Sequence, residues 1–174
     1  MPPRSLAVAS LLALAAALPG CGYSRVSYPK SRAESLSVAV QLFENRSFDP
    51  GYENLLADAL KEEFARRGAL RLTRNPETAD VVLRGAILPI GTGRRSFSSV
   101  VLALEYSVSV GLEVELQRPG SEIGIDRRLL REDDIYLASS DVEVTRRNRQ
   151  EALRRIAGLL AVRIHDVVFE VAPP

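Results

Sequence analysis

The sequence predicts an α+β domain in which a mostly antiparallel sheet of four or five strands carries two helices on one face. The first observation is a long segment, residues 100–116, in which every even position is apolar, as in a strand with one buried face. The second is a pair of segments, 52–67 and 145–169, whose apolar residues recur at helical spacing. Because the apolar strand face must be covered, we expect both helices to pack on it, in the order β-α-β-β-β-β-α.

A targeting segment precedes this domain. Residues 1–20 hold one early cation, Arg4, and an apolar run over residues 5–18, which has the length of a signal-peptide core and is short for a membrane span. The run closes with Leu18-Pro19-Gly20-Cys21, which resembles the lipobox of bacterial lipoproteins. The resemblance implies that Cys21, the sole cysteine, carries acyl chains that anchor the mature protein. Because Gly22 rather than Asp follows it, we expect the periplasmic side of the outer membrane.

The mature chain is expected to be a tether and one domain. Residues 21–35 are polar, show no periodicity and predict a lipidated tether, followed by a single domain over residues 36–174. Alternating apolar positions predict a first strand over residues 35–43. Asn, Asp, Pro and Gly in residues 44–51 then predict a loop.

The first helix is expected over residues 52–67. Its apolar stripe follows four-residue steps: Tyr52, Leu56, Leu60 and Phe64. Gly68 is the usual residue type just beyond a helix, and two arginines occupy the last turn, where the helix dipole favours cations. A short strand over residues 70–73 and a turn at residues 75–77 are expected next.

Two further strands flank the long one. Residues 81–90 predict a strand, and the glycines and arginines of residues 91–95 predict a loop that leads into the long strand. Because that strand is unusually long, we expect a bend or bulge near Gly111. A Pro-Gly turn at residues 118–121 precedes a fifth strand over residues 123–131, which returns antiparallel.

The acidic residues 132–143 predict a loop before the second helix, Thr145–Phe169. Its apolar stripe comprises Leu153, Ile156, Leu160, Ile164 and Val167. Its basic residues are expected to face outward: Arg146, Arg147, Arg149, Arg154 and Arg155. His165, the only histidine, lies beside the stripe and is interpreted as a structural residue.

The usual patterns of catalytic chemistry are missing from this sequence. One cysteine and one histidine provide no nucleophile pair and no zinc-ligand spacing, and no phosphate-binding loop or serine-hydrolase motif is present. Gly91-Thr92-Gly93 is interpreted as a flexible loop and Asp133-Asp134 as part of a solvated one. We therefore predict that the protein is no enzyme and uses no cofactor or metal. A formal charge of +1 also argues against a nucleic-acid partner.

Several segments occur in an order that matches a known family. They are Cys21–Tyr23, Val38–Arg46, Phe64–Gly68, Ala79–Ile87, Glu105–Tyr106, Tyr136, and the helical residues Glu151–Leu153 and Leu160–Ile164. Together they resemble the LptE family of lipopolysaccharide-assembly lipoproteins. The resemblance implies a plug inside the lumen of the outer-membrane β-barrel LptD, which helps the barrel assemble and helps lipopolysaccharide reach the cell surface.

A basic site follows from topology and from this resemblance. If strands three, four and five are antiparallel neighbours, the loop with Arg94 and Arg95 lies at the sheet end where the fifth strand exits. Arg146 and Arg147 begin the second helix after that exit. The resemblance implies that basic residues in these two loops contact lipopolysaccharide. Ordinary solvated surface charge remains the other interpretation of these four arginines.

Other classes of protein also remain open. A periplasmic lipoprotein that regulates a cell-wall synthase, and a curli-type secretion lipoprotein, resemble this chain in a first strand that ends like residues 43–47 and precedes a helix. Those classes are expected to contain more helix, so the single long alternating strand favours the LptE-like interpretation. A soluble ligand-binding module is disfavoured because the sequence gives no signal of an aromatic-lined pocket.

Overall fold

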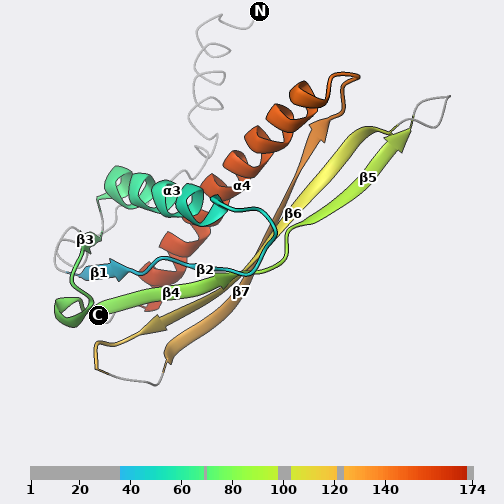
Figure 1. Ribbon diagram of the computed structural model, residues 1–174. Helices are drawn as coiled ribbons and strands as arrows, with labels where there is room; N and C mark the ends of the chain where they lie inside the picture. The colour runs from blue at the N-terminus through green and yellow to red at the C-terminus, as the bar shows by residue number, and fades with distance from the viewer. Residues whose placement is uncertain (1–35, 69, 98–102, 121–123, 172–174) are drawn as a thin grey trace, which may run out of the picture.

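The computed structural model describes residues 36–68, 70–97, 103–120 and 124–171 (Figure 1). The elements in chain order are β1 (Ser37–Val40), β2 (Glu44–Asn45), α3 (Tyr52–Arg67), β3 (Arg71–Thr73), η1 (Pro76–Thr78), β4 (Val81–Ile87), β5 (Gly91–Phe97), β6 (Ala103–Gln117), β7 (Gly124–Leu137) and α4 (Val142–Val171). The expected signal peptide, Cys21 and the tether lie outside the described residues.

The strands form one seven-stranded sheet of order β3-β1-β4-β6-β5, in which β2 pairs with β4 and β7 pairs with β6. The predicted α+β class is confirmed. The sheet is mixed, however, and has more strands than expected: β1 runs parallel to both β3 and β4, and β2 runs parallel to β4. Parallel pairing of β1 with β3 is possible because α3 provides the crossover connection between them.

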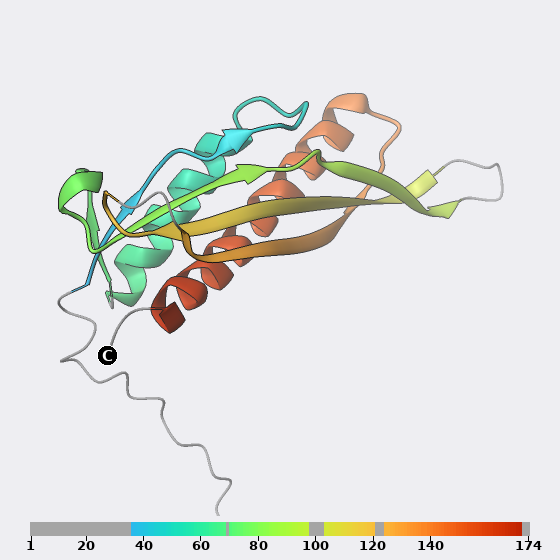
Figure 2. The same cartoon turned by 90° about the horizontal axis from the view of Figure 1, so that it is seen from below.

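β6 is the central strand of the antiparallel half, between β4 and β5 on one edge and β7 on the other. Its even positions from 108 onward are all buried: Val108, Val110, Leu112, Val114 and Leu116. These side chains belong to one core with α3 and α4, which lie on the same face of the sheet (Figures 1 and 2). The long alternating strand is thus confirmed over its described residues.

The two helices match their predictions closely. α3 has the expected bounds, and Gly68 ends it in the left-handed conformation, at φ 61°, with its N–H donating to the carbonyl of Phe64 at 3.1 Å. α4 extends the expected second helix at both ends. Its predicted apolar stripe is buried, together with Ala152, Ala157, Ala161 and His165.

Residues 91–95 are part of strand β5, not a loop. β5 pairs antiparallel with β6, which brings Gly91 opposite Ser109 and Gly93 opposite Ser107. A Cβ atom on Gly91 would lie 2.7 Å from the Ser109 hydroxyl oxygen, so glycine permits this close pairing. The glycines that suggested a loop are therefore packing positions within a strand.

The acidic segment after the fifth strand is also strand rather than loop. β7 continues to Leu137 and pairs with β6 without interruption from Asp126 to Leu137. Two of its acids are ion-paired with α4: Asp134 Oδ2 lies 2.6 Å from Arg155 Nε, and Glu132 Oε1 lies 2.5 Å from Arg163 Nη1. These partners, supplied from a distant part of the chain, make the charges compatible with the sheet.

The sequence predicts a bend or bulge near Gly111, and the β6–β7 pairing has no bulge there. The β6–β7 register runs unbroken past Gly111 and shifts between Leu116 and Gln117, while β5 has a bulge at Arg95. At Gly111 the space of a side chain is filled by Leu88, whose Cδ1 would lie 3.2 Å from an added Cβ. The expected first strand is shorter than predicted, and residues 44–45 of the expected loop form β2.

Candidate functional site

The N-terminus of α4 is fixed beside the end of β7. The Asp141 carboxylate accepts the backbone N–H of Glu143 at 2.8 Å and that of Val144 at 3.4 Å, which satisfies two free donors of the first turn. Asn148 Nδ2 donates to the Leu137 carbonyl at 2.9 Å. Arg146 and Arg147, in the first turns of the helix, are therefore held where β7 leaves the sheet.

Strand register brings Arg94 to the same end of the sheet. Arg94 on β5 lies opposite Tyr106 on β6, and Tyr106 lies opposite Tyr136 on β7. Two strand spacings separate the backbones of Arg94 and Tyr136, about 10 Å. Directly opposed residues share a face, so Arg94 lies on the helix-bearing face, while Arg95 occupies the bulge. Figure 1 shows the β5–β6 hairpin reaching past the start of α4.

The four-arginine surface, defined as Arg94, Arg95, Arg146 and Arg147, is exposed throughout. Arg146 is paired with Glu143, through Nε at 2.9 Å and Nη2 at 2.5 Å, and this hydrogen bonding raises the pKa of Arg146. Among the described residues, the other three arginines have no ion pair or hydrogen-bonded carboxylate. Three guanidinium groups are thus available to an anion without first releasing a carboxylate.

An aromatic and ionic cluster begins at Tyr106, which lies opposite Arg94 in the sheet. Tyr106 and Tyr136 stack with ring centroids 5.5 Å apart, and burial raises the pKa of Tyr136. Arg149 is bound to Asp49 and does not face outward as the sequence interpretation had it. Its position four residues before Leu153 places it on the buried stripe of α4, which is the signal that could have predicted a partner.

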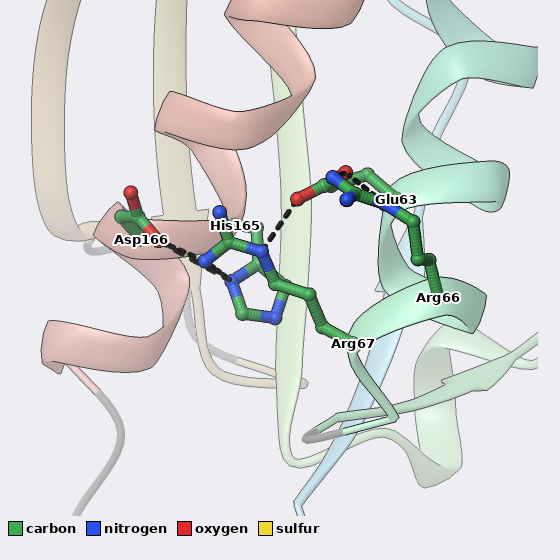
Figure 3. A network of polar contacts seen from close by, with 5 residues as sticks. All are labelled: Glu63, Arg66, Arg67, His165 and Asp166. Atoms are coloured by element: carbon green, nitrogen blue, oxygen red, sulfur yellow. Dashed lines mark hydrogen bonds and ion pairs between the residues drawn. The ribbon is translucent and has the colours of Figure 1, made fainter. Parts of the chain in front are cut away.

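A second polar cluster joins the far end of α3 to α4 (Figure 3). Glu63, buried on α3, accepts hydrogen bonds from Arg66 and Arg67. Arg67 Nη1 lies 2.5 Å from Asp166 Oδ1 and 3.3 Å from His165 Nδ1. His165 is buried and packs edge-on against Phe64, with ring centroids 5.2 Å apart. These contacts agree with the structural role expected for this histidine.

No group of three or more His, Cys, Asp or Glu side chains within the described residues is arranged to hold a metal ion. The pair Asp133-Asp134 lies in β7 rather than in a loop, with Asp133 exposed and Asp134 bound to Arg155. Within the same residues, no helix is both long enough and apolar enough to cross a membrane.

A family model described as lipopolysaccharide-assembly, LptE, matches residues 36–167, which is most of the chain. The chain belongs to the LptE family. This is a family of non-enzymatic outer-membrane lipoproteins. No curated protein sequence is significantly similar to the chain.

Solved structures of other lipoproteins share the LptE-like fold. Rare lipoprotein B from Shewanella oneidensis has a TM-score of 0.54 at 17% identity, over 74% of this chain and 93% of its own. A putative lipoprotein from Caulobacter crescentus has a TM-score of 0.54 at 16% identity, over 83% and 96%. A minor lipoprotein from Acinetobacter baumannii has a TM-score of 0.51 at 18% identity, over 74% and 86%.

Proposed function

We propose that the chain is the LptE component of lipopolysaccharide assembly. In this proposal it is an outer-membrane lipoprotein, anchored on the periplasmic side by acyl chains on Cys21, that occupies the lumen of an LptD-like β-barrel. It helps the barrel assemble and helps lipopolysaccharide reach the cell surface, and it acts by binding, without catalysing a reaction. The observation that carries the proposal is the family match over residues 36–167.

The open face of the sheet supports a position inside a wet barrel lumen, whose wall is polar. The odd positions of β6 point away from the helices and include Ser107, Ser109, Glu113 and Glu115. Glu115 is ion-paired with Arg84 and Glu113 with Arg46, at 3.4 and 3.3 Å. Such a face can be hydrated or can form polar contacts with the barrel wall.

The four-arginine surface supports contact with lipopolysaccharide phosphates. Guanidinium groups bind phosphate in a bidentate geometry, and a charge-assisted hydrogen bond contributes about 1.5–3 kcal/mol when partly shielded from water. Arg94, Arg95 and Arg147 can make such contacts directly, whereas Arg146 must exchange Glu143 for the phosphate. Two or more contacts of this kind would hold a lipopolysaccharide headgroup at this end of the sheet.

The first test is to extract tagged, lipidated protein in mild detergent and to identify what co-purifies by mass spectrometry. A large β-barrel protein at one-to-one stoichiometry is the expected result. Recovery of a peptidoglycan synthase, or of a secretion-type oligomer of this chain alone, would contradict the barrel proposal and favour the other lipoprotein classes.

The second test is reversal of charge at all four arginines, R94E/R95E/R146E/R147E, followed by measurement of lipopolysaccharide binding. Binding is expected to weaken strongly, and dephosphorylated lipopolysaccharide is expected to bind the native protein weakly as well. The matched control reverses four exposed arginines nearer the opposite end of the sheet: R71E/R74E/R118E/R127E. Equal binding by both variants would show that the four-arginine surface is ordinary solvated charge.

A further inference from the structure

β7 forms a long edge of the sheet. It pairs with β6 on one side, and among the described residues no strand pairs with its other side. In an antiparallel pair, alternate residues direct their backbone N–H and C=O groups either to the partner or outward. The side-chain hydrogen bonds to the carbonyls of Arg131, Ile135 and Leu137 identify the odd positions as the outward set.

Three side chains of α4 cover carbonyls of this outward set. Asn148 Nδ2 donates to Leu137 at 2.9 Å, Arg155 Nη2 to Ile135 at 3.4 Å, and Arg163 Nη1 to Arg131 at 2.9 Å. The donors are spaced seven and eight residues apart, so they project from one side of the helix along the strand. α4 therefore lines the β7 edge with side-chain donors where a neighbouring strand would supply backbone donors.

Acidic residues of β7 hold the covering arginines in place. Asp134 Oδ2 lies 2.6 Å from Arg155 Nε, and Glu132 Oε1 lies 2.5 Å from Arg163 Nη1. Asp134 also accepts the outward N–H of Ile135, at 2.7 Å. Each arginine thus donates hydrogen bonds to both a carboxylate and a backbone carbonyl of β7, which restricts its side chain to the strand edge.

Without these covering side chains, the outer edge of β7 could pair with the same edge of a second copy. If a second copy paired antiparallel about Leu130, Arg127 of each strand would oppose Asp133 of the other, and Leu129 would oppose Arg131. The two Arg–Asp oppositions are favourable cross-strand pairs. Leu129 is 55% exposed, so apolar surface at this edge would also be buried in such a pair. Unpaired strand edges with these properties are templates for strand addition.

We propose that the outer edge of β7 is a strand-pairing surface for a second copy of this chain, and that Asn148, Arg155 and Arg163 keep it closed. Arg155 and Arg163 compete directly for the Ile135 and Arg131 carbonyls, which a second β7 would need in this register, and Asn148 covers the last carbonyl of the strand, at Leu137. The closed edge keeps the protein monomeric, whatever larger partner it binds. This inference does not depend on lipopolysaccharide or on a barrel.

The first test mixes two differently tagged copies of the full chain in excess detergent and measures whether one tag co-purifies with the other. The second test measures the oligomeric state of each protein alone by sedimentation. The variant N148A/R155A/R163A removes the covering donors. The control K61A/Q150A/R154A also removes two cations and one amide, but from exposed helix positions. Lys61 and Arg154 are ion-paired within their own helices, and Gln150 has no partner among the described residues. We expect the native protein and the control to remain monomeric and the uncovered variant to shift to dimers that join the two tags.

A third variant identifies the surface used. Leu129→Lys, added to the uncovered variant, places like charges opposite Arg131 in the proposed register and should return the protein to monomers. An uncovered variant that stays monomeric would overturn the proposal. So would association that Leu129→Lys does not reverse, because misfolding or another surface would then be responsible.

Discussion

Arg149 on α4 donates two hydrogen bonds to the carboxylate of Asp49, from Nη1 at 2.5 Å and from Nη2 at 2.9 Å. The two residues are 100 positions apart, and their side chains are only 26% and 25% exposed. The pair fastens the first turns of α4 to the loop that enters α3. Hydrogen bonding to Asp49 raises the pKa of Arg149 despite the opposing effect of burial.

Arg149→Met is expected to lower the free energy of unfolding by about 1–3 kcal/mol. Methionine keeps the apolar stem but removes both donors, which leaves Asp49 partly buried without its partner. Breaking a fully buried pair costs about 3–5 kcal/mol, whereas an exposed pair contributes about 0–1 kcal/mol, and this pair lies between those limits. Urea titration of both proteins measures the difference.

The matched control for this pair is Arg154→Ala, which removes an arginine whose side chain is 61% exposed. Its effect is expected to stay within about 0.5 kcal/mol. A double-mutant cycle with Asp49→Asn then isolates the coupling between Asp49 and Arg149. A coupling energy near zero would mean that the bidentate contact does not support the fold.

His165→Phe is expected to remove a pH dependence of stability. Burial, and then the charge of Arg67, lower the pKa of His165 from its ordinary 6.5. The unfolded chain therefore binds a proton more readily, and the free energy of unfolding should fall as pH drops below about 6.5. Phenylalanine keeps an aromatic ring beside Phe64 and removes the imidazole Nε2, which is buried and has no hydrogen-bond partner among the described residues.

The measurement for His165 is a series of urea titrations from about pH 7.5 to about pH 5. Arg67 and Glu63 on α3 and Asp166 on α4 are the charged groups that face the imidazole, and all three remain in the variant. The native protein should lose stability across this range, and the variant should lose less. Parallel curves for the two proteins would show that another group titrates.

Glu63→Gln is expected to destabilise the protein at neutral pH by about 1–3 kcal/mol, since a buried acceptor of hydrogen bonds from Arg66 and Arg67 loses its charge. Burial works to raise the pKa of Glu63, but the arginine hydrogen bonds outweigh it and the net pKa is lowered from 4.5. Its contribution is therefore present above about pH 4.5 and is lost as pH falls below that value.

The neighbour Glu62 provides the control for Glu63. It is exposed and lacks a hydrogen-bond or ion-pair partner among the described residues, so Glu62→Gln should leave stability unchanged at neutral pH. The difference in free energy of unfolding between the native protein and Glu63→Gln should shrink as the pH falls below about 4.5. A constant difference at all pH values would mean that shape at this position, rather than charge, matters.

Short-range sequence patterns correctly predicted α3 and the buried face of β6. The apolar stripe and Gly68 set the bounds of α3, and strict alternation set the buried face of β6. The sequence interpretation missed β5 and the second half of β7, because their strand character depends on partners far along the chain. Asp134 is stabilised in a strand by Arg155, 21 residues away, and Glu132 by Arg163, 31 residues away.

The sheet end at which the four arginines lie could be predicted, but their ion pairing was not, and their role in binding stays a prediction. Topology placed Arg94 and Arg146 at one end of the sheet, and the strand register agrees. The Glu143 partner of Arg146 lies three residues earlier, at a spacing that could have been anticipated. The buried stripe could have predicted that Arg149 has a partner, but not that the partner is Asp49, because the loop that carries Asp49 is positioned only by the folded sheet.

Two glycine-to-alanine substitutions are expected to change stability in opposite directions. A Cβ on Gly85, in β4, would lie 2.1 Å from the Glu113 carbonyl oxygen and 2.6 Å from the buried Phe43 ring, so Gly85→Ala should cost about 1–3 kcal/mol or more. Gly158 lies in the interior of α4 with nothing within 4 Å of an added Cβ. Gly158→Ala should therefore stabilise the protein by about 0.5–1 kcal/mol through helix propensity.

Thermal and urea unfolding of the two alanine variants measure the effect of one added methyl group at a crowded strand position and at an open helix position. Because both substitutions add one methyl group, a general effect of alanine on the unfolded chain is common to them, and the difference reports the native packing. The β4–β6 pairing and the Phe43 ring must both move to admit a methyl group at Gly85. If Gly85→Ala has the same unfolding temperature as the native protein, β4 and β6 lie farther apart at this position than the structure shows.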